Sequence, residues 1–198
     1  MKILLSLIVF VFSTLGFSQN AESVLKSLQN KFDSITDLSA DVAQKSNGKT
    51  SLTGKMSFKK DNKIRIEFDN QTIVADGKTS WNYNKKNKKV IISDYDEAGS
   101  GLLSINYLVY QYPSQCDLSL SSEGSKTILI LTPKSKKENL GEVKLYINKE
   151  NLIDKAVIIN QTTGPMEVSF ANYKLNQNLS DSRFSFTAPE GTTVVDLR

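Results

Sequence analysis

The spacing of hydrophobic residues changes once along the chain, near residue 36. In NAESVLKSLQNKFDSI (residues 20–35) the apolar side chains recur at helical spacing and form one stripe, made up of Val24, Leu25, Leu28, Phe32 and Ile35. Asn20 stands directly before this run and is a typical N-cap residue. From Leu38 onwards apolar and polar residues alternate instead. The sequence therefore predicts one amphipathic helix followed by a long series of β-strands.

The alternation is clearest in KIRIEFD, residues 63–69. Ile64, Ile66 and Phe68 face one way, and the charged residues between them face the other. DLSADVAQK (37–45) and LTGKMSF (52–58) follow the same rule. Strict alternation is typical of antiparallel strands with one dry and one solvated face. The whole chain offers about eleven such strands, and a meander of this length is expected to curl because neighbouring strands twist.

Two stretches depart from the plain strand pattern. AGSGLLSINYLVYQYP (98–113) predicts a short, very apolar helix closed by Pro113, and the small residues 98–101 suit a hinge. TIVADGKTSWNYN (72–84) predicts a hairpin turning at Asp76–Gly77. Helices are the only elements left to cover the dry face of the sheet. We therefore expect a mostly β, α+β domain: one curved antiparallel sheet forming an unclosed β-barrel, with helices over its concave face.

The first eighteen residues have the pattern of a secretory signal peptide. Lys2 is followed by an apolar run over residues 3–12 and by the small residues Gly16 and Ser18. We expect cleavage after Ser18 and a single domain over residues 19–198. An uncleaved N-terminal anchor is the alternative. No cysteine follows the expected cleavage point, which argues against a lipid anchor there.

The charge balance excludes one class of protein and leaves a question open. Lys and Arg number 25 against 21 acidic residues, a net charge of +4, which is too mild for a nucleic-acid binder. Two lysine clusters, NKKNKK (84–89) and KSKKEN (134–139), are first of all solvated loop tips. Docking to an acidic partner or to an anionic membrane surface is the alternative interpretation.

Cys116 is the only cysteine, so no internal disulfide forms, and its setting predicts a buried strand position.

Candidate catalytic groups are scarce. The chain has no histidine, which excludes His-based triads and imidazole metal ligands. No Walker loop, dinucleotide-binding glycine motif or nucleophile elbow occurs. Asp94 and Asp96 could form a weak calcium site or a carboxylate pair, but a solvated turn is the better interpretation. We predict no enzyme, no cofactor and no metal. The apolar face of the sheet is then either a dry core or a cavity for an apolar guest.

Four stretches in chain order resemble the LolA-type outer-membrane lipoprotein carrier family. They are MSFKKDNKIRIEF (56–68), IVADGKTSWNYN (73–84), LTPK with EVKLYINKENLIDKAVI (131–134 and 142–158), and FSFTAPEGTTVVD (184–196). The second corresponds to the family's Asp-Gly-Lys-x-x-Trp-x-Tyr pattern, and the last to its Phe-x-Phe-x-x-Pro-x-Gly ending. Each motif is modest alone, but together they cover the chain from the first helix to the C-terminus.

The resemblance implies a monomeric, non-catalytic periplasmic carrier. Such a carrier holds lipoprotein acyl chains in its cavity, receives them from an inner-membrane ABC transporter and passes them to an outer-membrane acceptor. The alternative is a non-catalytic envelope lipid-binding or sensor protein of the same superfamily with a different cargo. The cavity residues that we expect on this basis are Met56, Phe58, Ile64, Ile66, Phe68, Trp81, Tyr83, Leu103 and Leu108.

One position departs from the family pattern. The family has a strand arginine, usually followed by proline, that hydrogen-bonds to the helical lid; here Lys60 and Asp61 stand in those places. We expect Lys60 to be the lid contact and to donate to the facing apolar helix over residues 102–109, although lysine lacks the planar fork of arginine. For Trp81 and Tyr83, a place in the cavity wall and ordinary core packing both remain open.

Overall fold

The computed structural model describes residues 20–46, 49–96, 105–135, 141–160 and 164–198. The expected signal peptide, Leu103 and the expected hinge at 98–101 lie outside the described residues. The helix α1 and the first six strands are α1 (Ala21–Asp33), β1 (Asp37–Ser46), β2 (Lys49–Lys59), β3 (Lys63–Phe68), β4 (Gln71–Asp76), β5 (Thr79–Asn84) and β6 (Lys89–Asp94). The later elements are η2 (Tyr107–Gln111), η3 (Tyr112–Gln115), β7 (Cys116–Glu123), β8 (Lys126–Pro133), β9 (Val143–Ile147), β10 (Ile153–Asn160), β11 (Gly164–Leu175), η4 (Asp181–Phe184) and β12 (Thr193–Asp196).

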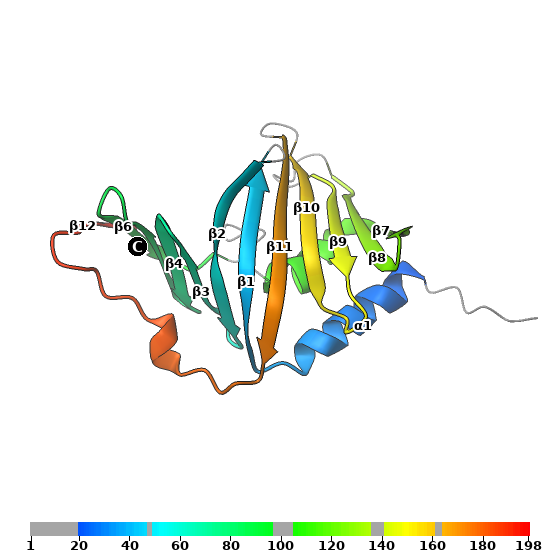
Figure 1. Ribbon diagram of the computed structural model, residues 1–198, viewed down its shortest axis with the longest axis horizontal. Coiled ribbons are helices and arrows are strands. Elements are labelled where there is room, and N and C mark those ends of the chain that lie inside the picture. The colour runs from blue at the N-terminus through cyan, green and yellow to red at the C-terminus, as the bar shows by residue number, and fades with distance from the viewer. Residues whose placement is uncertain (1–19, 47–48, 97–104, 136–140, 161–163) are drawn as a thin grey trace, which may run out of the picture.

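All twelve of these strands belong to one sheet, in the order β12-β6-β5-β4-β3-β2-β1-β11-β10-β9-β8-β7. Two meanders, β1 to β6 and β7 to β11, meet where β1 pairs antiparallel with β11, with Leu38 opposite Leu175. The sheet curves strongly, and its edge strands β12 and β7 lie far apart, so the barrel does not close (Figure 1). The predicted fold class, an unclosed curved sheet with few helices, is confirmed.

Helix α1 forms where the sequence predicts it. The Asn20 side chain caps its first turn by accepting a hydrogen bond from the Ser23 backbone N–H at 2.7 Å. Val24, Leu28 and Phe32, from the predicted stripe, are buried in one core cluster with apolar residues of β8 to β11. The helix lies across the half of the sheet that contains these strands (Figure 1). Its apolar stripe thus finds the surface that an amphipathic helix requires.

The second apolar stretch is helical from Ile105 to Gln115, although not as a regular α-helix. It passes through a π-helical turn, η2, into the 3-10 turn η3, and Pro113 occupies the start of η3. Val109 accepts a hydrogen bond at its carbonyl from Gln29 Nε2 of α1, at 3.1 Å. We call residues 105–111 the plug. Its central side chains are buried, so the predicted apolar helix is confirmed for the residues described.

The C-terminal segment produces a difference from the prediction. The alternation in RFSFTAP (183–189) predicts a strand, but Asp181–Phe184 form the 3-10 turn η4, and the strand of this region is β12, parallel to β6. Residues 176–186, here the strap, lie across the outer face of β2 to β4. Phe184 is 1% exposed there, and its neighbour Arg183 donates from Nε to the buried Ser57 hydroxyl at 2.8 Å. The outer face of these strands is therefore not the solvated face that alternation predicted.

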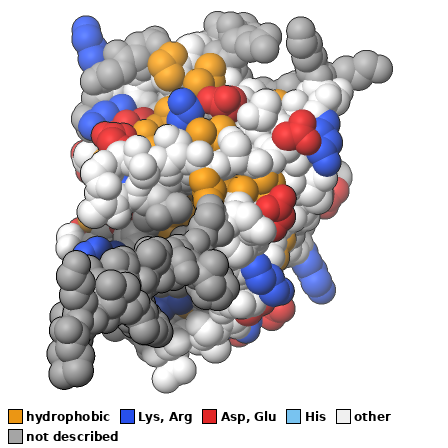
Figure 2. Space-filling model, turned by 90° about the vertical axis from the view of Figure 1, so that its right-hand side faces the viewer, with side chains coloured by type: hydrophobic (Ala, Val, Ile, Leu, Met, Phe, Trp, Pro, Cys, Tyr) orange, Lys and Arg blue, Asp and Glu red, His pale blue; other side chains and the backbone are white. Residues whose placement is uncertain are grey.

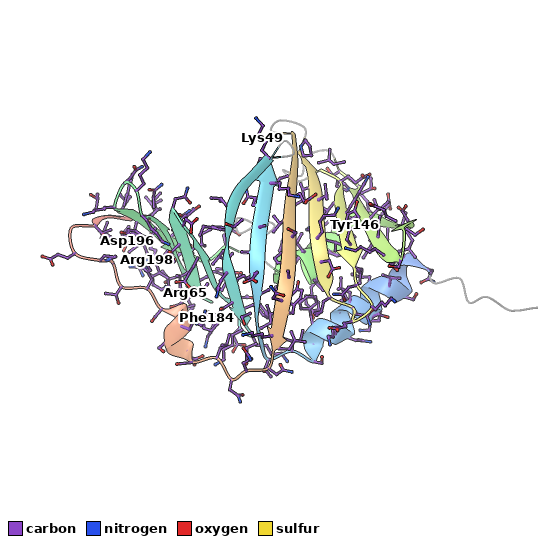
Figure 3. All side chains as sticks on the ribbon, viewed as in Figure 1. Lys49, Arg65, Tyr146, Phe184, Asp196 and Arg198 are labelled. Atoms are coloured by element: carbon purple, nitrogen blue, oxygen red, sulfur yellow. The ribbon has the colours of Figure 1, made fainter. Side chains whose placement is uncertain are left out.

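Side chains of the charged outer stripe of β2 and β3 hold the strap in place. Arg65 donates from Nη1 to the carbonyls of Arg183 and Ser185, both at 3.3 Å, and it lies beside Phe184 in Figure 3. Lys59 and Lys63 both contact the Asp181 carboxylate, at 2.7 and 3.1 Å. These contacts hold the pKa of Asp181 below its ordinary value. The sheet is thus covered on its inner face in one half and on its outer face in the other.

Within the described ranges, no helix has both the length and the apolar content needed to cross a bilayer.

Candidate binding site

The pairing register of β3 to β6 decides which side chains share a face. Residues directly opposite each other in an antiparallel pair point to the same side of the sheet. Ile66 lies opposite Ile73, Ile73 opposite Asn82, and Asn82 opposite Ile91. Because Ile66 belongs to the main core, this row faces the concave side.

The inner face of these strands holds an open hollow of about 390 Å³. The residues around it are Ile64, Ile66, Ile73, Ala75, Ser80, Trp81, Asn82, Ile91, Ser93, Asp94 and Asp96. Ligand pockets of proteins have this size range and combine a mostly apolar lining with a few polar groups. Ile91 is 38% exposed in the hollow, a high value for a strand isoleucine beside the core.

The polar groups in the hollow bond to one another. The hydroxyls of Ser80 and Ser93 are 2.8 Å apart, and Gln71 Nε2 donates to Asn82 Oδ1 at 2.7 Å. These polar groups already have hydrogen-bond partners within the protein. An apolar ligand can therefore cover them without removing all of their hydrogen bonds. The geometry therefore suits a largely apolar ligand.

A smaller cleft of about 270 Å³ lies where the end of α1 meets the β2–β3 turn. Its lining residues are Phe32, Asp33, Phe58, Lys60, Asp61, Asn62, Ile105, Asn106 and Tyr110. Lys60 is exposed at this cleft, and its Nζ donates to the Asp33 carbonyl at 2.9 Å. A cation at the carbonyl end of a helix is favourable because the unpaired carbonyls there carry partial negative charge.

Lys60 therefore contacts α1, whereas the prediction tied it to the apolar helix that is now the plug. The link to the plug is indirect. Tyr110 of the plug donates from its hydroxyl to the Asp33 carboxylate at 2.6 Å, next to the carbonyl that Lys60 holds. Burial, together with this hydrogen bond and the nearby negative charge, raises the pKa of Tyr110 well above its ordinary value. The hydroxyl thus stays protonated and able to donate.

Three of the expected cavity residues lie in tightly packed core. Met56 and Leu108 lie around a void of only about 10 Å³ together with five residues of α1, the plug and the sheet, namely Phe32, Ile105, Ile153, Phe170 and Tyr173. Such a void is at the limit for a single water molecule. Phe68 is 2% exposed and belongs to the same core cluster. Met56, Leu108 and Phe68 consequently have no space for a guest in this conformation.

Trp81 and Tyr83 lie on the other face from the isoleucines with which they were grouped. Trp81 is opposite Val74, and Tyr83 is opposite Thr72, in the row that points outward. The Tyr83 ring packs on Phe186 of the strap, with ring centroids 5.4 Å apart. Trp81 also borders the hollow, but its register assigns the side chain to the outer face. The expectation that Tyr83 shares a wall with Ile64 and Ile66 is therefore corrected, whereas Trp81 stays at the border of the hollow.

Sequence reasoning also missed residues of the hollow. Its inner-face members on β4 to β6 that were not predicted are Ile73, Ala75, Ser80, Asn82, Ile91 and Ser93. A signal was available in the sequence. With a two-residue turn at 69–70, strict alternation pairs Ile66 with Ile73 and leaves Val74 on the outer face. Extending the same alternation across the Asp76–Gly77 turn gives Asn82, and not Trp81, an inner position.

Acidic side chains stand near one end of the hollow. Asp94 and Asp96 are exposed there, and no group of three or more metal-ligating residues occurs among the described ranges. Arg198 holds the pKa of Asp196 down to about 2 through hydrogen bonds of its side chain and backbone, and the two residues lie side by side at the end of β12 in Figure 3. On the side of the molecule that Figure 2 presents, apolar side chains reach the surface in small groups among polar and charged ones.

Comparison with known proteins identifies relatives over nearly the whole chain. Residues 33–187 match the family described as "Outer membrane lipoprotein carrier protein LolA". The outer-membrane lipoprotein carrier protein of Legionella pneumophila (strain Lens) is 26% identical over 201 residues, with 98% of this chain and 99% of that protein covered. An uncharacterized protein of Methanocaldococcus jannaschii is 28% identical over 201 residues, and the chain spans 58% of its length.

A solved structure supports the same fold. The crystal structure of an uncharacterized conserved protein from Thermus thermophilus superposes with a TM-score of 0.62 at 18% identity, covering 89% of this chain and 98% of that one. At this identity the likeness concerns the fold alone. The family match is the decisive finding because it covers well over half of the residues. The chain belongs to the outer membrane lipoprotein carrier family, LolA.

Proposed function

We propose that this protein is a non-catalytic periplasmic carrier that binds the acyl chains of lipoproteins and shuttles them from the inner to the outer membrane. The single observation that carries the proposal is the open, mostly apolar hollow on the inner face of β3 to β6. Membership of a family whose named relatives are outer-membrane lipoprotein carriers supports it.

The hollow can take acyl chains without a large rearrangement of the core. Its floor is made by Ile64, Ile66 and Ile73, and Ile91 forms a partly exposed side. The floor residues Ile64 and Ile66 are already buried, and burying the exposed surface of Ile91 against an acyl chain is favourable by roughly 25 cal/mol per Å². The paired polar groups at Ser80 and Asn82 allow the contact to remain loose enough for release.

In this proposal the partners are an inner-membrane ABC lipoprotein transporter and an outer-membrane acceptor. The protein acts as a monomer, exported by a signal peptide that is removed after Ser18. The plug and α1 serve as the movable cover. Few polar contacts join them, chiefly Tyr110 with Asp33 and Gln29 with Val109, so moving one against the other breaks few hydrogen bonds and mainly separates apolar side chains.

The proposal is tested by a matched pair of isoleucine substitutions. Ile91→Glu places a carboxylate in the hollow, where burial under an acyl chain costs several kcal/mol. Ile159→Glu makes the same change on β10 at nearly the same exposure, 41% against 38%, and outside the hollow. Each variant and the wild-type protein is purified from the native envelope, and its bound lipoprotein is identified by mass spectrometry.

The carrier function predicts lipoprotein on the wild-type protein and on Ile159→Glu, and little or none on Ile91→Glu. Equal loading of all three proteins would contradict the assignment of the hollow. Free lipid without lipoprotein on the wild type would instead favour an envelope lipid binder or sensor of the same superfamily.

A further inference from the structure

The turn between β5 and β6 concentrates positive charge at one end of the sheet. Lys85, Lys86, Lys88 and Lys89 surround Asn87 in this turn, and all are exposed. We call these five residues the lysine tip. Lys85 donates from Nζ to the Phe68 carbonyl, so its amine is held by the protein. No ion pair within the described ranges involves the other three lysines, although eight ion pairs are found there.

Hydrogen bonds fix the backbone of the tip. The Asn84 side chain accepts a hydrogen bond from the Asn87 N–H at 2.9 Å, and the Lys85 N–H donates to the Asn70 carbonyl at 2.9 Å. Lys88 has a positive φ of 45°, a conformation that glycine and asparagine adopt at much lower cost than lysine. The chain thus keeps a lysine at a position where turn geometry favours another residue. Strained positions of this kind are often functional.

The same strands have the opposite charge at their far ends. β4 ends at Asp76, β6 ends at Asp94 with Asp96 next, and β12 ends at Asp196. These four carboxylates outnumber the nearby cations Lys63, Lys78 and Arg198 by one, whereas at the tip the four lysines outnumber the acids Asp69 and Glu190 by two. An anionic surface would therefore attract one end of the β5–β6 hairpin and repel the other, which fixes the orientation of the molecule.

We propose that the lysine tip is a docking surface for anionic phospholipid headgroups, and that it orients the protein on a membrane independently of any cargo. Lysine-only clusters suit a diffuse anionic surface, because each ammonium acts as a point charge. A structured acidic protein partner would favour arginines that bind carboxylates through two hydrogen bonds. Val194, 52% exposed on β12 opposite Val90, adds an apolar side chain one residue beyond the tip.

The experiment uses vesicles without lipoprotein, so its outcome does not depend on the carrier function. Wild-type protein is sedimented with vesicles of phosphatidylglycerol and phosphatidylcholine, or of phosphatidylcholine alone, at low and high salt. We expect binding to the anionic vesicles only, and its loss at high salt through screening. Replacement of Lys86, Lys88 and Lys89 by Gln should weaken it by about a hundred-fold, since each lysine near an anionic surface contributes roughly five-fold.

The matched control replaces three exposed lysines outside the tip, Lys55, Lys149 and Lys174, by Gln, with the same change of net charge. It should bind the anionic vesicles with little loss. Lys88→Gly should raise the thermal unfolding midpoint, because it relieves the positive φ, and yet weaken vesicle binding about five-fold.

If the tip variant and the control lose vesicle binding equally, binding depends on net charge alone, and the proposal is overturned. Equal binding of the wild type to neutral and anionic vesicles would overturn it as well. If the wild type ignores both vesicles but binds an Asp/Glu-rich peptide, the tip docks an acidic protein and the membrane proposal fails.

Discussion

The two halves of the sheet are covered on opposite faces, although Ile64, Ile66 and Phe68 of β3 belong to the main core on the inner face. In the β8 to β11 half, α1 and the plug cover the inner face, and the space left near Leu108 is about 10 Å³. In the β3 to β6 half, the strap covers the outer face and buries Phe184 and Val74 there. The inner face of this half keeps a hollow of about 390 Å³.

The difference shows how one sheet can be stable and still offer an open apolar surface. Hydrophobic stabilisation depends on the area removed from water and not on the face of the sheet where this happens. Because the strap supplies the buried layer outside, the inner face of β3 to β6 need not close on itself. The packed half then serves mainly stability and the strapped half mainly binding.

The largest effect is expected from a cavity in the packed half. Leu145 is fully buried on β9, so Leu145→Ala should lower the free energy of unfolding by about 2–5 kcal/mol. Urea denaturation measures this loss. At temperatures where the variant remains folded, its affinity for a fluorescent fatty acid should equal that of the wild type. A large loss of affinity in the folded variant would show that the two halves are not separate in function.

The strap should give the next largest effect. Phe184→Ala removes its main apolar anchor, and we expect a loss of about 2–3 kcal/mol, somewhat less than for a core phenylalanine because the strap can detach locally. Hydrogen exchange should then accelerate at residues 176–186 and in β4 and β5, while β8 and β9 stay protected. Uniform acceleration over the whole sheet would contradict the division into halves.

A smaller effect is expected from the contact between Lys60 and α1. Lys60→Leu removes the hydrogen bond to the Asp33 carbonyl, and because Lys60 is exposed the stability should change by less than about 1 kcal/mol. We predict that the lid equilibrium shifts enough for cargo to be accepted and then retained. The measurement is lipoprotein release from the purified carrier to outer-membrane vesicles. Equal release from both proteins would remove Lys60 from the mechanism.

The smallest effect concerns the pH dependence of the strap. Hydrogen bonds from Lys59 and Lys63 lower the pKa of Asp181 in the folded protein, so its stabilising contribution is present above the ordinary value of 3.8 and is lost as the pH falls below it. At pH 7 the Asp181→Asn variant should melt slightly below the wild type. This difference in midpoint should become smaller as the pH falls below 3.8, and it should vanish once Asp181 is protonated in the folded protein as well. A difference that stays constant at acidic pH would assign it to packing and not to charge.

The sequence predicts the elements of this fold better than their faces. The cap at Asn20, the stripe of α1 and the alternation of β3 are local patterns, and the structure confirms them. The place of Trp81 depends on register across two turns, which a pattern within one strand does not contain. The strap escaped prediction for a related reason: Phe184 and Phe186 alternate like a strand, yet they pack across strands that are far away in sequence.

Chemical mapping of a bound acyl chain tests the division of the sheet most directly. A fatty acid that carries a photoreactive diazirine is bound to the protein and activated by light, and the labelled peptides are identified by mass spectrometry. The account predicts labels on inner-face residues of β4 to β6, chiefly Ile73 and Ile91, which competing unlabelled fatty acid removes. Specific labels on β8 to β10, around Leu129, Leu145 and Ile158, would show that the guest enters the packed half and would contradict it.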